Sequence, residues 1–222
     1  PVRSRTEFGS AGRVYPVSPK YGELKGLVCY PDLGAVPDPC DLAIVVVGAR
    51  HVPAVLDQCG ARGIPFAIVL SAGFQEIGER GADNQRALEA VLARNPVRIV
   101  GPNCIGMLNV SEHIHAGFGG AMSNPDLRPG RLAMVTQSGG FGFGMVAAAD
   151  QQGVGFNYVV STGNETDLKA MELIRYLLER DDTDAVKLAE QMGGSRAIVM
   201  RGNGVVTAGG GIQHAVVFMS YL

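Results

Sequence analysis

The chain has 222 residues, of which 46% are hydrophobic and 18% charged, and its formal net charge is −2. This length and apolar content allow one or two domains with a large core. The charge balance gives no basic stripe, which argues against nucleic acid as a partner, and neither a signal peptide nor a run of roughly 18 apolar residues that could span a membrane is visible.

The first forty residues predict little regular structure. Residues 1–12 lack periodicity and are interpreted as a linker or the remains of a missing element, and residues 14–17 as a short strand. In the turn that follows, Pro19 fixes the backbone, and Lys20 lies at the carboxyl end of the strand, where α/β folds bind ligands. A phosphate or ribose contact and a solvated lysine both remain open for Lys20.

Apolar strands and amphipathic helices alternate from residue 41 onward. Strands are expected at residues 41–47, 66–70, 97–100, 132–135 and 155–160, and helices at residues 52–62, 83–94, 145–152 and 167–180. Residues 41–47 are continuously apolar after the first position, which predicts a central strand of a parallel sheet. Thr166 is the expected N-cap of the last helix. The alternation is typical of an α/β fold.

Two turns at predicted strand ends carry candidate ligand contacts. Ser71-Ala72-Gly73-Phe74 is rich in small residues, and Glu76 just beyond it is either a catalytic carboxylate or a solvated loop acid. Asn103 could hydrogen-bond a ligand carbonyl or phosphate. Cys104 could be a nucleophile, but a buried thiol is favoured because no histidine lies close in sequence. The four cysteines form no Cys-x-x-Cys pair, which indicates reduced thiols in a cytoplasmic protein.

The turn after residues 132–135 has the layout of an anion site. It joins a buried strand to a helix, and the first N–H groups of a helix have no acceptor within the helix. Gly139 and Gly140 would let a phosphate approach the backbone, and the hydroxyls of Thr136 and Ser138 could donate hydrogen bonds. An ordinary turn with Ser138 as N-cap is the alternative.

Residues 111–129 are polar and glycine-rich, so the domain boundary is placed there. They contain His113-Ile114-His115. Alternate residues of a strand face the same side, so this pair could chelate zinc, but a third protein ligand is not evident and no metal is predicted.

Up to about residue 182 the chain resembles the CoA-binding subunit or region of the NDP-forming acyl-CoA synthetases, a family that includes the succinyl-CoA synthetase α subunit. The matching motifs occur in the family's order: Tyr15-Pro16-Val17-Ser18-Pro19-Lys20, Asp41 to Val47, Ser71 to Glu76, Gly101-Pro102-Asn103-Cys104-Ile105-Gly106, Ser138-Gly139-Gly140, and Gly163-Asn164-Glu165 with Asp167. Each is weak alone, but six in register make a specific signal.

The resemblance implies an N-terminally truncated, Rossmann-like CoA-binding domain at residues 1–128 and a partial, flavodoxin-like succinyl-CoA-synthetase domain at residues 129–183. Such enzymes convert acyl-CoA, phosphate and NDP to acid, CoA and NTP, passing the phosphoryl group through a histidine. CoA is the implied cofactor, with contacts at Ser18, Lys20, Leu70, Ser71 and Ala72. The phosphate or active-site turn is then formed by Asn103, Thr136, Ser138, Gly139 and Gly140. ADP or ATP with Mg²⁺ is expected to bind through an ATP-grasp β-type partner subunit, or within a homo-oligomer.

Two family segments are not recognised in this chain, namely the first strand with its glycine-rich CoA loop and the segment with the phosphorylated histidine. None of His51, His113, His115 and His214 has the context of that histidine, so no catalytic residue is assigned. A CoA- or nucleotide-binding module without turnover is therefore the alternative function.

The last residues resemble a different family. Ser195 to Val206 is similar to the C-terminal part of class II aldolases and related decarboxylases, whose "RGHG" motif supplies a metal-binding histidine. Asn203 stands in the position of that histidine. We expect residues 184–222 to be an aldolase-like tail that joins near residues 183–186, through a fused or rearranged gene. A fragment of a metal-dependent aldolase or decarboxylase is thus a third hypothesis.

Overall fold

The computed structural model describes residues 12–37, 39–183 and 217–219. The strands are β1 (Glu23–Leu24), β2 (Leu27–Val28), β3 (Leu42–Val45), β4 (Phe66–Val69), β5 (Arg98–Val100), β6 (Gly106–Asn109), β7 (Ile114–Gly117), β8 (Leu132–Thr136), β9 (Phe156–Ser161) and β10 (Val217–Met219). The α-helices are α2 (Val52–Ala61), α3 (Ala82–Leu92), α4 (Gly139–Gln151) and α5 (Ala170–Leu178). Short 3₁₀ segments lie at Leu33–Ala35, Ala49–His51, Gln75–Gly81 and Ala121–Ser123.

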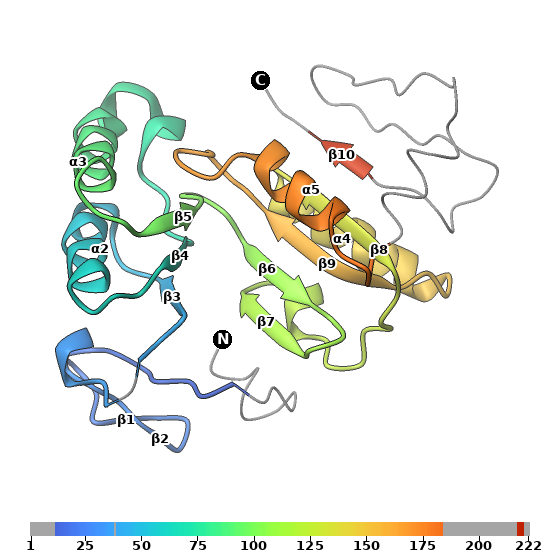
Figure 1. Cartoon of the computed structure of the whole chain (residues 1–222), viewed down its shortest axis with the longest axis horizontal. Coiled ribbons are helices and arrows are strands. Elements are labelled where there is room, and N and C mark those ends of the chain that lie inside the picture. Colours follow the sequence, from blue (N-terminus) through green and yellow to red (C-terminus); the bar gives the residue numbers. More distant parts are fainter. Residues whose placement is uncertain (1–11, 38, 184–216, 220–222) are drawn as a thin grey trace.

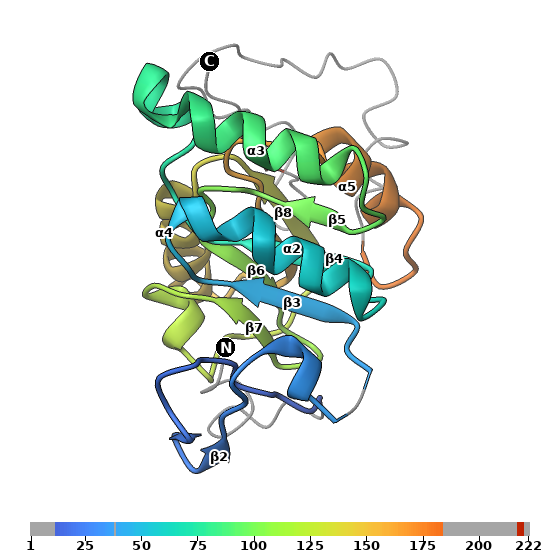
Figure 2. The same cartoon turned by 90° about the vertical axis from the view of Figure 1, so that its left-hand side faces the viewer.

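The first half of the chain forms a parallel three-stranded sheet in the order β3-β4-β5. Helices α2 and α3 lie next to each other on one face of this sheet, on its outer side in Figure 1 and in front of it in Figure 2. Leu56 and Leu88 from the two helices pack with Val69 and Ile99 from the strands, and all four side chains are fully buried. Removing this apolar surface from water stabilises the packing of α2 and α3 on the three-stranded sheet.

The second half is a sheet in the order β10-β8-β9-β6-β7, in which β8, β9 and β10 are parallel and β6 and β7 form an antiparallel pair. Successive residues of β8 face opposite sides, as the strand period requires. Met134 packs into the cluster that contains Phe143 of α4. Val135 packs into the cluster that contains Ile174 and Leu177 of α5. The sheet therefore has one helix on each face, as Figure 1 shows.

The two sheets pack against each other through the face of the first sheet that α2 and α3 leave uncovered. Ile68 and Val100 lie in one apolar cluster with Ala116 of β7 and Val160 of β9. Strands β6 and β7 precede residue 129 but pair with each other and, through β6, with β9. The second sheet therefore extends across the expected boundary between residues 128 and 129, and that boundary stays a prediction.

The structure confirms the mixed α/β class and the relative order of the predicted strands and helices between residues 41 and 180, but the antiparallel strands β6 and β7 between them were not predicted. Four further corrections apply, two of which concern predicted strands. The strand predicted at residues 14–17 is wrong, because only an isolated bridge between Val17 and Tyr30 forms there. Strand β3 is an edge strand among the described residues rather than a central one. It ends at Val45, and Val46 is 68% exposed.

The other two corrections concern helix starts. Helix α4 begins at Gly139, six residues before the start expected at residue 145. Helix α5 begins at Ala170, and its N-cap is Lys169 rather than Thr166. The backbone N–H of Lys169 donates to the Glu172 carboxylate at 3.0 Å, a contact at the helix start that the sequence pattern did not reveal.

The predictions for residues 1–11 and for the tail from residue 184, with its Asn203 and His214, fall almost wholly on positions outside the described residues. Across the part of the chain that is described, none of the helices combines the length and the apolar composition needed to cross a bilayer.

Candidate functional site

Four turns meet where the carboxyl ends of β4, β5, β8 and β9 come together. Three backbone hydrogen bonds join them in sequence. The N–H of Asn103 donates to the carbonyl of Ser71 at 2.9 Å, that of Asn164 to Pro102 at 2.9 Å, and that of Thr162 to Thr136 at 2.8 Å. Ligands of α/β proteins bind outside the carboxyl ends of the strands, so this junction is the candidate site.

Two glycines allow the turns to approach so closely. Gly163 has a positive φ of 58°, and a Cβ at this position would overlap the carbonyl oxygen of Pro102. A Cβ on Gly139 would lie 2.5 Å from Ile105 in the turn after β5. A residue with a side chain could not come so close without displacing its neighbour, so these two glycines let the turn after β5 lie against the turn after β9 and the start of α4.

The N-terminus of α4 faces this junction with uncapped donors. Ser138 is the N-cap residue, as the alternative interpretation expected, but its side chain makes no capping hydrogen bond. The first N–H groups of the helix have no acceptor within it, and the helix dipole adds positive potential there. Gly140 is exposed, and nothing lies within 4 Å of the position that its Cβ would take. The start of α4 thus offers donors and space for an anion.

The hydroxyl of Thr136 is not available to a ligand. Its side chain is 1% exposed, and Oγ1 donates to the carbonyl of Ser138 at 3.2 Å. Thr136 therefore shapes the turn, and a contact between its hydroxyl and a phosphate stays a prediction.

The predicted CoA contacts after β4 are open through backbone rather than side chains. The Ser71 hydroxyl donates to the carbonyl of Val47 at 2.5 Å and accepts from its N–H at 3.3 Å. The Leu70 side chain is 8% exposed and packs in the cluster between the two sheets. Ala72 is exposed. A ligand here would meet the backbone of the turn and the methyl group of Ala72.

Ser18 and Lys20 are held in a separate turn. The N–H of Ser18 donates to the carbonyl of Tyr30 at 2.8 Å, and the Ser18 hydroxyl accepts from the N–H of Lys20 at 3.3 Å. Lys20 is exposed. The hydrogen bonds given for this turn stay within residues 16–30 and do not tie it to Ser71, so its role as a CoA contact stays a prediction.

A polar network links the turns after β4, β5 and β9. Asn103, with a φ of 58°, donates from Nδ2 to Oδ1 of Asn164 at 3.2 Å. Asn164 donates from Nδ2 to Oε2 of Glu76 at 2.5 Å. The Glu76 carboxylate also accepts from the N–H groups of Gly73 and Phe74, the latter at 3.1 Å. The Glu76 side chain therefore fixes the end of the loop that follows Ser71 and Ala72.

These hydrogen bonds hold Glu76 in its ionised form. Desolvation by burial acts to raise the pKa of the Glu76 carboxyl group, but hydrogen bonds from Gly73, Asn164 and Phe74 outweigh it and lower the pKa below its usual value. The sequence left Glu76 as either a catalytic acid or a solvated loop acid. In the structure its carboxylate accepts hydrogen bonds from the backbone of its own loop, and these bonds favour the ionised form.

Asp167 ties the loop before α5 to the first sheet. It accepts from the N–H of Ile99 at 2.7 Å and forms an ion pair with Arg98 at 3.0 Å. Arg98 also reaches Glu172 at 3.2 Å. Asp167 therefore also connects the two sheets, at a place away from the candidate ligand edge.

The remaining chemically versatile side chains do not join the site. Cys104 is 3% exposed, its Sγ donates to the carbonyl of Val69 at 3.4 Å, and burial raises the pKa of its thiol to about 12, which confirms a buried structural cysteine. His115 is 3% exposed and its Nδ1 lies 3.0 Å from the carbonyl oxygen of Met122. His113 precedes β7 with a φ of 53°, so the two histidines do not alternate along one strand. Among the described residues no three His, Cys, Asp or Glu side chains are grouped to hold a metal ion.

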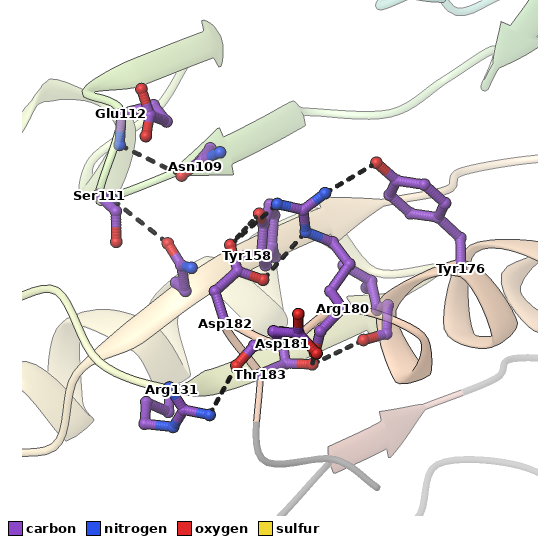
Figure 3. Close-up of polar contacts among 12 residues, drawn as sticks. Asn109, Ser111, Glu112, Arg131, Tyr158, Tyr176, Arg180, Asp181, Asp182 and Thr183 are labelled. Atoms are coloured by element: carbon purple, nitrogen blue, oxygen red, sulfur yellow. Dashed lines mark hydrogen bonds and ion pairs between the residues drawn. The ribbon is translucent and has the colours of Figure 1, made fainter.

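A second polar cluster lies at the opposite end of the strands of the second sheet, and Figure 3 shows it in close-up. Tyr158 donates its hydroxyl to Asp182 at 2.6 Å, and Arg180 forms an ion pair with the same carboxylate at 2.9 Å. Burial raises the pKa of Tyr158 to about 12, and its hydrogen bond to Asp182 acts in the same direction. Arg131, just before the first residue of β8, donates to the carbonyl of Asp181 at 2.8 Å. This cluster therefore lies at the amino end of β8, opposite the candidate site.

A cavity of about 370 Å³ borders this cluster and is lined by Tyr176, Glu179, Arg180, Asp181 and Asp182. The side chains of Arg180 and Asp182 already pair with each other, so the one arginine that lines the cavity is engaged. We therefore place the functional site at the strand carboxyl ends rather than at this cavity.

Sequence reasoning missed the roles of Glu76 and Asn164. Asn164 was named only within a family motif, and Glu76 was considered only as a catalytic or a solvated acid. Their hydrogen bond joins residues 88 positions apart. The motif matches were the only signal in the sequence that could have drawn attention to them.

Two family comparisons agree with this architecture. Residues 5–109 match the family described as CoA binding domain, and residues 129–201 match the succinyl-CoA ligase like flavodoxin domain. The second match covers the first part of the segment for which we expected an aldolase-like tail, and the comparisons do not support that resemblance.

Curated relatives are ligases. The chain is 41% identical over 176 residues to ADP-forming acetate–CoA ligase I of Archaeoglobus fulgidus, covering 79% of this chain and 25% of the relative. It is 32% identical over 189 residues to the α subunit of ADP-forming acetate–CoA ligase I of Pyrococcus furiosus, covering 83% and 40%. This chain thus spans between about a quarter and two fifths of the length of these relatives.

Solved structures give the same result. Dinucleotide-forming acetyl-coenzyme A synthetase 1 of Ca. Korarchaeum cryptofilum, in complex with phosphate and ADP, superposes with a TM-score of 0.74 at 31% identity. The match covers 82% of this chain and 38% of that one. The chain therefore contains a Rossmann-like CoA-binding domain and a flavodoxin-like domain of the succinyl-CoA ligase type.

Proposed function

We propose, from the pairing of a CoA-binding domain with a succinyl-CoA ligase-like domain, that this chain forms part of an NDP-forming acid–thiol ligase. The reaction is acyl-CoA + phosphate + NDP to acid + CoA + NTP. A phosphate oxygen attacks the thioester carbonyl, the C–S bond breaks, and CoA leaves as the thiol. The acyl phosphate formed then gives its phosphoryl group to a histidine and finally to the nucleotide, which we take to be ADP because the named relatives are ADP-forming.

The observation that carries this proposal is the convergence of four turns from two sheets at one edge. The turns after β4 and β5 belong to residues matched by the CoA-binding domain, and those after β8 and β9 to residues matched by the ligase-like domain. Their backbone hydrogen bonds bring a candidate CoA edge and a candidate phosphate turn together at one junction. Attack by phosphate on a thioester requires such closeness.

In this proposal the CoA edge consists of Ala72 and the backbone of Leu70 and Ser71, with Lys20 and Ser18 approaching from their own turn. Small side chains let a pantetheine or pyrophosphate group approach the backbone of this turn, and an exposed lysine suits a phosphate. Leu70 and Ser71 fit this role only through their backbone, because both side chains are already engaged.

The start of α4 would bind the phosphate or the transferring phosphoryl group. The N–H groups of Gly139 and Gly140 supply fixed donors, and backbone donors stabilise charge that develops on phosphoryl oxygens. Ser138 lacks a capping bond and so could contribute its hydroxyl. Asn103 would border the same space from the turn after β5.

The nucleotide is expected to bind elsewhere. We propose that ADP and Mg²⁺ reach this site through an ATP-grasp β-type subunit or a second copy of the chain, in the cytoplasm. The name of the P. furiosus relative as an α subunit supports a partner subunit. The acyl group stays unassigned.

Calorimetric titration of CoA into the chain tests the proposal. We expect saturable heat with a Kd between about 1 μM and 1 mM. A Lys20→Ala variant should weaken binding by about three- to tenfold, because exposed charge contacts contribute about 1 kcal/mol. Lys25→Ala is the matched control, since Lys25 is an exposed lysine in the separate turn between β1 and β2. Absence of heat at millimolar CoA would overturn the proposal.

Incubation with γ-labelled ATP and Mg²⁺ separates a ligase from a binding module without turnover. A ligase should acquire label that is acid-labile and base-stable, as expected for phosphohistidine. A chain that binds CoA but acquires no such label, with or without a β-type subunit, would favour the binding module instead.

A further inference from the structure

We infer that Asn164 is a positioning residue that couples the loop after β4 to the turn after β5, an inference that rests on the proposed function. Both segments belong to the first sheet, whereas Asn164 follows β9 in the second. In the proposed ligase these segments border CoA and phosphate, respectively. The N–H of Asn103 already joins the turn after β5 to Ser71, and Asn164 would add a second link, made through side chains, that fixes their alignment.

All four polar groups of Asn164 are used for this purpose. Its N–H donates to the carbonyl of Pro102 at 2.9 Å, and its carbonyl accepts from Nε2 of Gln75 at 3.0 Å. Its side-chain oxygen accepts from Asn103 at 3.2 Å, and its side-chain nitrogen donates to Glu76 at 2.5 Å. A side-chain amide has one donor group and one acceptor group, so Asn164 can donate to the Glu76 carboxylate and accept from the Asn103 amide. Neither a carboxylate nor a hydrocarbon side chain at position 164 could do both.

Glu76 extends the bridge to the ligand loop. Its carboxylate binds the N–H groups of Gly73 and Phe74, which directly follow the exposed Ala72. The chain of contacts therefore runs from Asn103 through Asn164 and Glu76 to the backbone beside Ala72. A shift at either end must move the other or break one of these hydrogen bonds. Those that end at the Glu76 carboxylate involve a charged group and are among the stronger kinds.

Attachment of the two sheets does not by itself require this bridge. Asp167 joins them through Arg98 and the N–H of Ile99 on β5, on the side of α5. The Asn164 bridge instead ends at the two predicted ligand contacts, Asn103 and the Ser71–Gly73 loop. We therefore ascribe to Asn164 the alignment of those contacts, because misplacement of a reacting group by about 1 Å can lower a reaction rate by about a hundredfold.

A reciprocal exchange of donor and acceptor tests this inference. Asn164→Asp removes the donor and sets two carboxylates against each other, so CoA affinity should fall by about tenfold. Adding Glu76→Gln restores the pair in reverse, because the introduced glutamine amide can donate to the introduced aspartate and still accept from the N–H groups of Gly73 and Phe74. The double variant should bind CoA within about threefold of the wild-type protein, a rescue that indicates a specific interaction.

Amide exchange rates of Gly73 and Phe74, measured by NMR without CoA, give a second readout. They should rise in Asn164→Asp and return toward the wild-type rates in the double variant. Asp167→Asn is the matched control, because it weakens the other tie between the sheets and should leave both amides and CoA affinity unchanged.

The two readouts separate failure of this inference from failure of the proposed function. If the wild-type protein does not bind CoA, the proposed function fails, and the exchange rates alone decide whether Asn164 orders the loop. Unchanged exchange at Gly73 and Phe74 in Asn164→Asp, equal changes in Asp167→Asn, or no rescue in the double variant would each overturn the inference.

Discussion

The second sheet has a polar region at each end of its strands, and the two regions differ in whether their hydrogen-bonding groups already have partners. At the amino end of β8, Tyr158, Arg180 and Asp182 form a charged and aromatic cluster beside a cavity of about 370 Å³, and each group has a partner within the cluster. At the carboxyl ends of the strands, the start of α4 has no side-chain cap and Gly140 faces open space. Charged groups that already pair with each other are expected to stabilise the fold, whereas backbone N–H groups at a helix start without an acceptor are expected to bind a ligand.

The largest expected effect comes from the packing that holds the ligand edge together. Gly139→Ala should destabilise the protein by about 1–3 kcal/mol, because its Cβ would lie 2.5 Å from Ile105 and force the turn after β5 to move. Urea unfolding measures the change. Gly140→Ala is the matched control on the same helix, since its Cβ meets nothing within 4 Å. It should leave stability unchanged or raise it by about 0.5–1 kcal/mol. Equal destabilisation by both variants would mean that the close approach of Ile105 does not constrain this turn.

A smaller effect is expected in the cluster at the amino end of β8. Tyr158→Phe removes the hydroxyl that donates to Asp182 at 2.6 Å and should destabilise the protein by about 1 kcal/mol. CoA affinity should stay within about twofold of wild type, because the cluster lies at the opposite sheet edge. A large loss of CoA affinity together with unchanged stability would reverse the assignment of the two regions.

The smallest effect is a pH dependence from the same cluster. First Arg180 and then Tyr158 lower the pKa of Asp182 to about 2. A carboxyl group whose pKa is lower in the folded than in the unfolded state contributes stability above its unfolded pKa of about 3.9, and this contribution is lost as the pH falls toward about 2. Asp182→Asn should therefore reduce the acid dependence of unfolding between about pH 4 and pH 2, by a modest amount because the pair is partly exposed.

Unfolding curves of both proteins across this pH range provide the check. Asp83→Asn serves as the comparison, since Asp83 belongs to a more exposed ion pair with Arg86. An identical acid dependence in wild type and Asp182→Asn would contradict the assignment of a folded-state ion pair to Asp182.

The sequence predicted strands β3, β4, β5, β8 and β9 because continuous apolar runs are local patterns, but it missed β6 and β7, which have no such run. It misplaced the start of α4, because a stretch with glycines at positions 139, 140, 142 and 144 has low helix propensity. The close packing of Gly139 on Ile105 and of Gly142 on Thr136 suits glycine in the helix, and these contacts depend on the tertiary fold. Local propensity could not reveal them.

Strand β3 and the candidate functional site also depend on the tertiary fold, which local sequence patterns do not reveal. The apolar run at residues 41–47 predicted a central strand, yet Val46 is 68% exposed and β3 lies at the edge of its sheet among the described strands. The bridge from Asn103 through Asn164 to Glu76 joins segments 61 and 88 residues apart. The motifs marked these turns, but only the fold shows which of their side chains are exposed and which are already bonded.

The most direct measurement is a map of backbone amide chemical shifts as CoA and phosphate are added together to the chain. We predict the largest changes at Ala72, Asn103 and Gly140, with none at Tyr176, Arg180 or Asp182. Changes concentrated at Arg180 and Asp182, or no change anywhere at millimolar ligand, would contradict the placement of the site at the carboxyl ends of the strands.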